Sequence, residues 1–210
     1  MTEASEILQR PQLTLLLGGV RSGKSAKAVA LAKQHQREGR TLFVATAEVF
    51  DHDAEMRARI AAHRQERPPT WDTLESPLAL ASDLSRTLAE HRPGHSVIVI
   101  DCLTLWVSNI LLSLPGDADA EAIVADHAAD LLSVRNRSRA LAHWIVVSNE
   151  VGLGIVPATS LGRRYRDALG RANQLVAAAA NEVILMVAGL EMSLKSQSQS
   201  ARSDARGLVT

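Results

Sequence analysis

The stretch Gly18-Gly19-Val20-Arg21-Ser22-Gly23-Lys24-Ser25 follows the apolar run Leu13–Leu17 and opens a segment with helical spacing, Ser25–Arg37. It fits the pattern G-x-x-x-x-G-K-[S/T], whose glycines let the backbone bend until successive N–H groups point at phosphate oxygens. The following helix directs the positive end of its dipole at the same place. We therefore predict a P-loop that binds the phosphates of ATP or GTP. A chance glycine-rich turn is disfavoured because a strand and a helix flank the motif.

Two side chains of this loop are expected to have chemical roles. Lys24 should reach the β- and γ-phosphates, and the Ser25 hydroxyl should bind Mg²⁺. A second metal partner is expected in Asp101, because Ser96–Asp101 is an apolar run that ends in a carboxylate. The alternative is that Asp101 only caps a helix beginning near Leu103. For Arg21, a phosphate contact and a solvated loop position are equally compatible with the sequence.

The fold class predicted from the rest of the chain is α/β: a P-loop NTPase (RecA-like) with a mostly parallel central sheet flanked by helices. Short apolar runs without alternation are typical of strands covered on both faces, and here they alternate with longer segments of helical spacing. The expected strands are Leu13–Leu17, Thr41–Thr46, Ser96–Asp101, Trp144–Ser148 and Glu182–Val187, with a weaker signal around Trp71–Leu74. The expected helices are Ser25–Arg37, Pro77–His91, Ala120–Leu141 and Ser160–Ala179.

The chain of 210 residues is long enough for one domain. We expect a flexible N-terminal extension over 1–11, a single P-loop domain over 12–192, and a disordered polar tail over 193–210. Lys+Arg and Asp+Glu both number 23, and such a balance argues against nucleic-acid binding. With the single cysteine Cys102 and no long apolar run, the expectation is a cytoplasmic protein without membrane insertion.

The segment Asp51–Arg67 has the pattern of a polar helix ended by Pro68-Pro69, and it contains His63, a candidate nucleophile. His63 is flanked by Arg59 and Arg64, and cations beside an imidazole favour its neutral, nucleophilic form. A neutral imidazole can attack an α-phosphorus to form a phosphoramidate. Spacing alone favours a structural or surface histidine instead, and none of the seven histidines has a metal-binding spacing.

Taken together, several segments resemble a known family, the bifunctional adenosylcobinamide kinase / adenosylcobinamide-phosphate guanylyltransferases of cobalamin biosynthesis. The resemblance extends from about Leu13 to Gly189. The P-loop alone fits many functions, whereas R-I-x-x-H-R and N-E-V-G-x-G-I-V-P are far more specific. The segments are Gly18–Ser25, Val44–Glu48, Arg59–Pro68, Trp71–Pro77, Asp101–Asn109, Ser148–Pro157 and Tyr165–Gln174.

The resemblance implies that a nucleoside triphosphate phosphorylates adenosylcobinamide, and that GTP then donates GMP to the product through a covalent GMP-histidine. The position that matches this histidine is His63. Nucleotide contacts are implied at Thr46, Ala47, Glu48, Arg64, Gln65, Glu66, Arg67, Glu75 and Asp101. From the residues alone, Glu75 would be interpreted as a surface carboxylate. Asn149 and Glu150 end a predicted strand, and substrate or metal contact and simple turn capping are equally supported for them.

The resemblance also implies a homo-oligomer, with a trimer the expected form, and Mg²⁺ acting with ATP or GTP. Three other functions predict different features. A P-loop kinase of another small molecule or nucleotide would transfer only the γ-phosphoryl group. A nucleic-acid-dependent ATPase would need a basic or aromatic binding surface, and only 3% of this chain is aromatic. A GTP-binding switch would need an Asn-Lys-x-Asp segment, which the sequence lacks.

Overall fold

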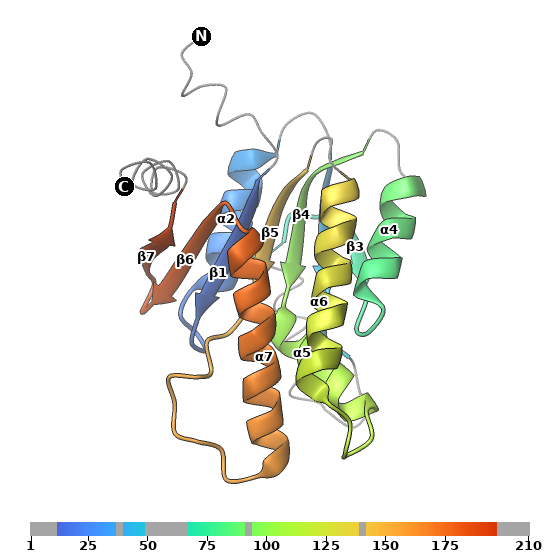
Figure 1. The fold of residues 1–210 in the computed structure, drawn as a ribbon. Coiled ribbons are helices and arrows are strands. Elements are labelled where there is room, and N and C mark those ends of the chain that lie inside the picture. The colour runs from blue at the N-terminus through green and yellow to red at the C-terminus, as the bar shows by residue number, and fades with distance from the viewer. Residues whose placement is uncertain (1–11, 37–39, 49–66, 91–93, 139–141, 197–210) are drawn as a thin grey trace, which may run out of the picture.

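The computed structural model describes residues 12–36, 40–48, 67–90, 94–138 and 142–196, which form a helix-covered sheet (Figure 1). The sheet has seven strands in the order β3-β2-β4-β5-β1-β6-β7. All pairings are parallel except that of β7 with β6. The strands are β1 (Leu13–Gly18), β2 (Arg40–Ala45), β3 (Asp72–Glu75), β4 (His95–Asp101), β5 (His143–Val147), β6 (Glu182–Val187) and β7 (Leu190–Lys195). The helices are α2 (Lys24–His35), α4 (Leu80–Glu90), α5 (Leu103–Ser113), α6 (Ala120–Arg137) and α7 (Ser160–Ala179).

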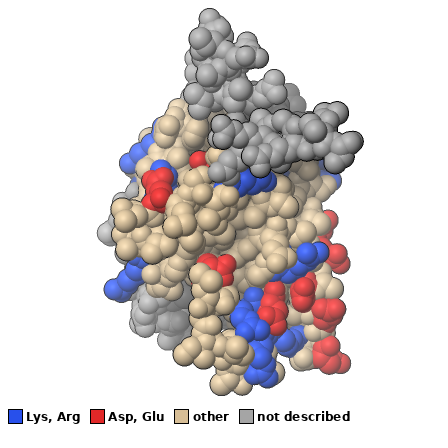
Figure 2. All heavy atoms as spheres, turned by 60° about the vertical axis from the view of Figure 1, so that its left-hand side comes forward, with Lys and Arg blue, Asp and Glu red and all other residues tan. Residues whose placement is uncertain are grey.

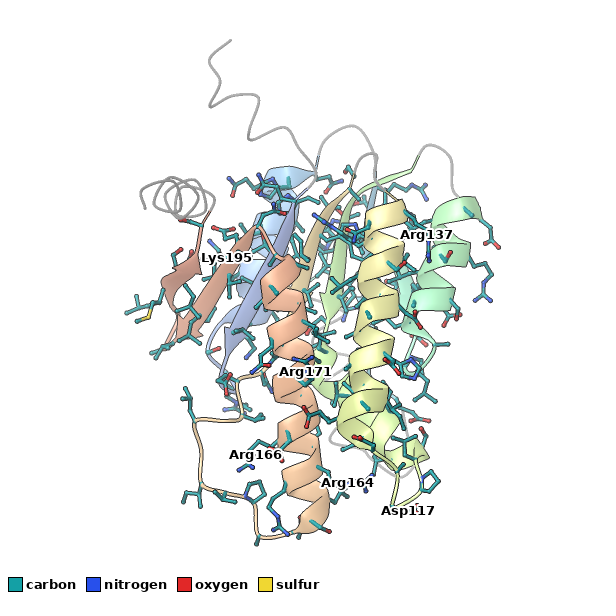
Figure 3. The ribbon with its side chains drawn as sticks, in the orientation of Figure 1. Asp117, Arg137, Arg164, Arg166, Arg171 and Lys195 are labelled. Carbon is teal, nitrogen blue, oxygen red and sulfur yellow. The ribbon has the colours of Figure 1, made fainter. Side chains whose placement is uncertain are left out.

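The last strand, β7, was not expected from the sequence. It extends the sheet beyond the predicted boundary at 192/193, so Ser193–Lys195 belong to the sheet and not to a tail. Its apolar side chains Leu190, Met192 and Leu194 are exposed, and Figure 2, which brings this side forward, shows mainly uncharged side chains over much of it. The ammonium of Lys195 donates to the carbonyls of Ala177 and Ala178 at the end of α7 (Figure 3), which ties the strand to the helical layer.

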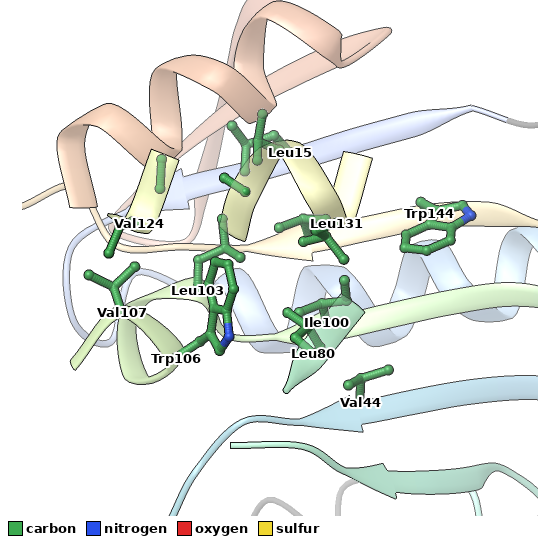
Figure 4. Packing of buried hydrophobic residues seen from close by; sticks show 14 of the residues in the cluster. Leu15, Val44, Leu80, Ile100, Leu103, Trp106, Val107, Val124, Leu131 and Trp144 are labelled. Atoms are coloured by element: carbon green, nitrogen blue, oxygen red, sulfur yellow. The ribbon is translucent and has the colours of Figure 1, made fainter. Parts of the chain in front are cut away.

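Alternation along the buried strands supplies two hydrophobic layers. Successive side chains of a strand point to opposite faces, so Ile98 and Ile100 pack beneath α4–α7 while Val97 and Val99 pack beneath α2. The larger layer includes Trp106 of α5 (Figure 4), which is 1% exposed. Its indole N–H donates to the Leu78 carbonyl at 3.0 Å. Because both faces are covered, the buried strands contain continuous apolar runs.

The expected α/β architecture with a mostly parallel sheet is confirmed. The five expected strands and the weaker one around Trp71–Leu74 are present with small shifts of their ends, and helix Ser160–Ala179 has the predicted limits. The predicted helix Asp51–Arg67 lies outside the described residues except for Arg67, as do the extension 1–11 and the segment 197–210. Within the described part of the chain, no helix is long and apolar enough to span a bilayer.

Candidate nucleotide site

The P-loop connects β1 to α2, and two of its glycines are required by their backbone geometry. Gly18 has φ 147° and Gly23 has φ 98°, a region that side chains other than glycine rarely adopt. A Cβ on Gly18 would collide with the carbonyl oxygen of Met186 on β6 and lie 2.7 Å from Ser22 Oγ. Arg21 also has a positive φ of 58° and an exposed side chain, and Val20 is 78% exposed. The loop therefore packs on β6 and leaves its tip open to solvent.

Lys24 is buried inside the loop, where protein oxygens occupy its three donor positions. Its ammonium donates to the carbonyls of Gly18 at 2.9 Å and Gly19 at 2.5 Å, and to Ser22 Oγ at 3.3 Å. Burial lowers the pKa of this ammonium, and the neighbouring Cys102 and Asp101 act in the opposite direction. A phosphate oxygen entering the loop can therefore replace these acceptors and gain a cation that is already in place.

The Ser25 hydroxyl and the Asp101 carboxylate meet at the carboxyl ends of β1 and β4. Ser25 donates to Asp101 Oδ2 at 3.3 Å. The N-cap of α5 is Cys102, so the interpretation of Asp101 as the helix cap is wrong. A hydroxyl and a carboxylate are hard oxygen donors that suit Mg²⁺, which usually binds one or two protein groups together with phosphates and water. The pair fits that ion, while no group of three or more His, Cys, Asp or Glu in the described ranges forms a fuller metal cage.

Strand register brings the other predicted site residues to the same edge. Ala45 at the end of β2 pairs with Glu75 on one side and with Asp101 on the other. Glu75 is exposed at the end of the edge strand, and Thr46, Ala47 and Glu48 follow β2 directly. The carboxyl edge therefore assembles residues that are far apart in the sequence, as expected for a parallel α/β sheet.

Thr46 is buried and its hydroxyl is used within the protein. It accepts from the Cys102 N–H at 2.9 Å and donates to the Cys102 carbonyl at 2.7 Å. Asn109 of α5 then donates to the carbonyls of Thr46 at 2.8 Å and Pro77 at 3.0 Å. Burial, followed by the charge of Asp101, raises the pKa of the Cys102 thiol to about 11, so the thiol stays protonated at neutral pH. Asn109 thus links the segments that follow β2 and β3 to α5, a role that a polar residue in a helix does not indicate from the sequence.

The turn after β5 is held by side chains from two helices. Thr104 Oγ1 accepts from the Asn149 N–H at 2.9 Å, and Asn173 of α7 donates to the Asn149 carbonyl at 3.0 Å. Asn173 also accepts from Ser148 Oγ at 2.6 Å. The Glu150 carboxylate accepts from the Gly152 N–H at 2.6 Å, which is a turn-capping contact. The backbone of Asn149 is fixed by its neighbours, and Glu150 lies beside the loop because its own N–H donates to the Gly18 carbonyl at 3.2 Å.

Arg67, one of the implied nucleotide contacts, is stacked on an aromatic ring of β2. The guanidinium of Arg67 lies 3.4 Å from the centre of the Phe43 ring, and Phe43 is packed against Trp71 in the layer beneath α2. A stacked guanidinium of this kind anchors the chain to β2. His63, Arg64, Gln65 and Glu66 lie outside the described residues.

Comparisons with known proteins agree with this arrangement. The family model described as "Cobinamide kinase / cobinamide phosphate guanyltransferase" matches residues 14–194. The "bifunctional adenosylcobalamin biosynthesis protein CobU" of Escherichia coli is 38% identical over 189 residues, covering 87% of this chain and 99% of the relative. The corresponding protein CobP of Pseudomonas aeruginosa is 41% identical, with 87% and 97% covered, and CobU of Salmonella typhimurium is 37% identical, with 87% and 99% covered.

Among solved structures, one described as an ATPase domain is 14% identical with a TM-score of 0.51, covering 84% of this chain and 69% of that one. At this identity the likeness concerns the fold alone, and it agrees with the expected α/β architecture built on a mostly parallel sheet. The family match spans the P-loop, Asp101 and the Asn149 turn, and the curated relatives are covered almost from end to end. The chain belongs to the cobinamide kinase / cobinamide phosphate guanyltransferase family.

Proposed function

We propose that one P-loop serves two successive reactions of adenosylcobalamin biosynthesis. In the first, ATP or GTP donates its γ-phosphoryl group to the aminopropanol hydroxyl of adenosylcobinamide. In the second, GTP donates GMP to adenosylcobinamide phosphate, giving adenosylcobinamide-GDP and pyrophosphate. The observation that carries the proposal is the family match over residues 14–194, which encloses a formed P-loop with Lys24 and the Ser25–Asp101 pair at its base.

For phosphoryl transfer, the protein has to position the triphosphate and neutralise negative charge as it moves. Backbone N–H groups of the loop and the Lys24 ammonium would bind the phosphate oxygens, in exchange for the internal acceptors that Lys24 now contacts. Ser25 and Asp101 would hold Mg²⁺, which supplies further positive charge beside the phosphates. The acceptor hydroxyl would approach from the carboxyl edge of the sheet, where Asn149 and Glu150 are candidate substrate contacts.

For guanylyl transfer, the family resemblance assigns the nucleophile to His63. An imidazole nitrogen attacks the α-phosphorus of GTP, a P–N bond forms, the bond to the bridging oxygen breaks, and pyrophosphate leaves. A phosphate oxygen of adenosylcobinamide phosphate then attacks the same phosphorus and releases the histidine. The groups that bind the γ-phosphate during the kinase step can stabilise the departing pyrophosphate in this step.

Further nucleotide contacts are proposed at Ala47, Glu48 and Glu75, and at the stretch Arg64–Arg67. Two residues that the resemblance implies as nucleotide contacts, Thr46 and Arg67, have partners in other parts of the protein. The hydroxyl of Thr46 is bonded to Cys102, its N–H to the Asp101 carbonyl and its carbonyl to Asn109, so we assign Thr46 the role of positioning the neighbouring Ala47 and Glu48. Arg67 is stacked on Phe43, and we assign it the role of anchoring the segment that carries His63.

A homo-oligomer in the cytoplasm, with a trimer the expected form, completes the proposal. Exposed apolar side chains support association of copies: Val187, Leu190 and Met192 are 55%, 74% and 56% exposed on the β6–β7 hairpin. Leu153 and Ile155 in the connection before α7 are 85% and 96% exposed. Sedimentation at several protein concentrations measures the oligomeric state, and a monomer at every concentration would contradict this part.

The covalent route is tested by incubating the chain with Mg²⁺ and GTP labelled at the α-phosphate. We expect an acid-labile protein adduct and an equivalent release of pyrophosphate, both lost in His63→Ala. The matched control is His52→Ala in the same segment, which should keep both. Absence of the adduct in the native chain, or its survival in His63→Ala, would contradict the covalent route. Phosphorylation of adenosylcobinamide without pyrophosphate release would favour a kinase without guanylyl transfer.

A further inference from the structure

The outer side of the P-loop rests on the β6–β7 hairpin. The N–H of Gly189 at the hairpin turn donates to the carbonyl of Ser22 at 3.0 Å. A Cβ on Gly23 would lie 3.4 Å from the Gly189 Cα and 3.6 Å from Met186 Cε, and Gly18 lies against the Met186 carbonyl. The loop therefore contacts the hairpin at both of its motif glycines.

The hydrogen bond between Gly189 and Ser22 orients a backbone N–H of the P-loop toward the phosphate site. In a trans peptide the carbonyl oxygen and the following N–H point in opposite directions. Because the Ser22 carbonyl is held outward by the hairpin, the N–H of Gly23 points to the other side, toward the interior of the loop. Inward-pointing backbone N–H groups are what a P-loop presents to phosphate.

A second link joins the hairpin to the first turn of α2. Lys27 Nζ lies 2.6 Å from Glu191 Oε1 on β7, and the Lys27 N–H donates to the Gly23 carbonyl at 3.0 Å. The two side chains are only partly exposed, 22% for Lys27 and 47% for Glu191. The pair thus couples the start of the phosphate-binding helix to the strand behind the loop.

The hairpin turn has a backbone that fits this contact. Ala188 has φ 52° and Gly189 has φ 82°, and two successive residues with positive φ are typical of the tight turns that match the twist of paired strands. A Cβ on Gly189 would meet nothing within 4 Å, so there is room for a side chain at this position. What disfavours a side chain is the positive φ of the backbone. Substitutions at Gly189 therefore report on the turn geometry alone.

We propose that the β6–β7 hairpin sets the shape of the P-loop, and that Gly189 and Glu191 are positioning residues for triphosphate binding. The inference builds on the proposed function, since both reactions share this loop. Changes at these residues should weaken nucleotide binding in both reactions by the same factor and leave the turnover of the bound nucleotide nearly unchanged. Both residues lie outside the P-loop, so the effect would pass through their contacts with Ser22, Gly23 and Lys27 of α2.

The test measures equilibrium binding of Mg²⁺ with a non-hydrolysable GTP analogue to the full chain, with thermal unfolding in parallel. Glu191→Gln should raise Kd about two- to fivefold, the range of a partly exposed ion pair. Gly189→Val should raise it about tenfold or more, because a β-branched residue resists positive φ. Gly189→Asn, which tolerates this conformation, should stay within about twofold of the native Kd. The control Ser193→Ala on the same strand should bind as the native chain does.

The outcomes separate this inference from the proposed function. An unchanged Kd in both Glu191→Gln and Gly189→Val would overturn the positioning role. An equal rise in Kd for Gly189→Asn and Gly189→Val would overturn it as well. Equal weakening in Ser193→Ala would show a general effect of disturbing β7 and would also overturn it. If Gly189→Val does not fold, the Kd of Glu191→Gln alone tests the positioning role. Failure of the native chain to bind the analogue would instead refute the proposed function.

Discussion

Acid should destabilise this protein through His143, at the amino end of β5 and thus at the end of the sheet opposite the P-loop. His143 is 7% exposed, its ring is stacked on His35 at 3.8 Å between centroids, and Nε2 lies 3.2 Å from Thr14 Oγ1. Burial first, then the charges of His35 and Arg135, lower the pKa of His143 from 6.5 to about 3. The folded protein therefore holds this ring neutral over a pH range in which the unfolded chain protonates it.

The sign and size of the effect follow from proton linkage. A group whose pKa is lower in the folded state contributes stability that is fully present above the unfolded pKa and is lost as pH falls below it. For pKa values of 6.5 unfolded and about 3 folded, the free energy of unfolding should fall by about 2 kcal/mol between pH 7 and pH 5 from this residue alone.

Urea unfolding of the native chain and of His143→Gln at pH 7, 6 and 5 measures this contribution. The variant loses the stacking and the contact with Thr14, so it is expected to be less stable at pH 7. The difference between the two proteins should then shrink by about 2 kcal/mol on going to pH 5, since the variant has no imidazole to protonate. His127→Gln on α6 is measured alongside, as a control for the removal of a different histidine. Parallel curves for the native chain and His143→Gln would refute the reasoning.

Three further substitutions probe the site. Gly18→Ala places a Cβ against the Met186 carbonyl and should weaken nucleotide binding at least about tenfold; native affinity by calorimetric titration would be incompatible with the packing described. Asp101→Asn removes a charge from the Ser25 pair and should raise the Mg²⁺ concentration for half-maximal phosphoryl transfer about tenfold, whereas an unchanged Mg²⁺ requirement would argue against the metal role. Asn109→Ala leaves the carbonyls of Thr46 and Pro77 without this donor and should lower the free energy of unfolding by about 1–3 kcal/mol; a change below about 0.5 kcal/mol in urea unfolding would count against the network.

The sequence predicted the parts of the fold that rest on local patterns. Buried parallel strands contain uninterrupted apolar residues, and the P-loop has a strict spacing between Gly18 and Lys24, so both were recognisable without tertiary information. Parallel strands bring their carboxyl ends to one edge of a sheet, whereas the register that places Glu75, Ala45 and Asp101 side by side comes from the structure. These features explain why the carboxyl edge was identified as the site.

The features that were missed depend on long-range contacts. β7 alternates polar and apolar residues on an exposed edge, and its Ser and Lys residues are typical of tails as well as of edge strands. Asn109 and Asn173 lie in helices, where a polar residue usually faces solvent, and only the packed structure shows that they bond strand ends. The Thr46 hydroxyl and the Arg67 guanidinium were implied as nucleotide contacts, yet each has an internal partner that no local pattern indicates.

The most direct test supplies adenosylcobinamide, ATP, GTP and Mg²⁺ together and identifies the corrinoid products by mass spectrometry. Two transfers at one P-loop predict adenosylcobinamide phosphate first and adenosylcobinamide-GDP later, with both products lost in Lys24→Ala. Formation of the phosphate without the GDP product would contradict the second transfer. Lys24→Ala is also given adenosylcobinamide phosphate with GTP, and loss of only one of the two transfers would contradict the claim that a single loop serves both reactions.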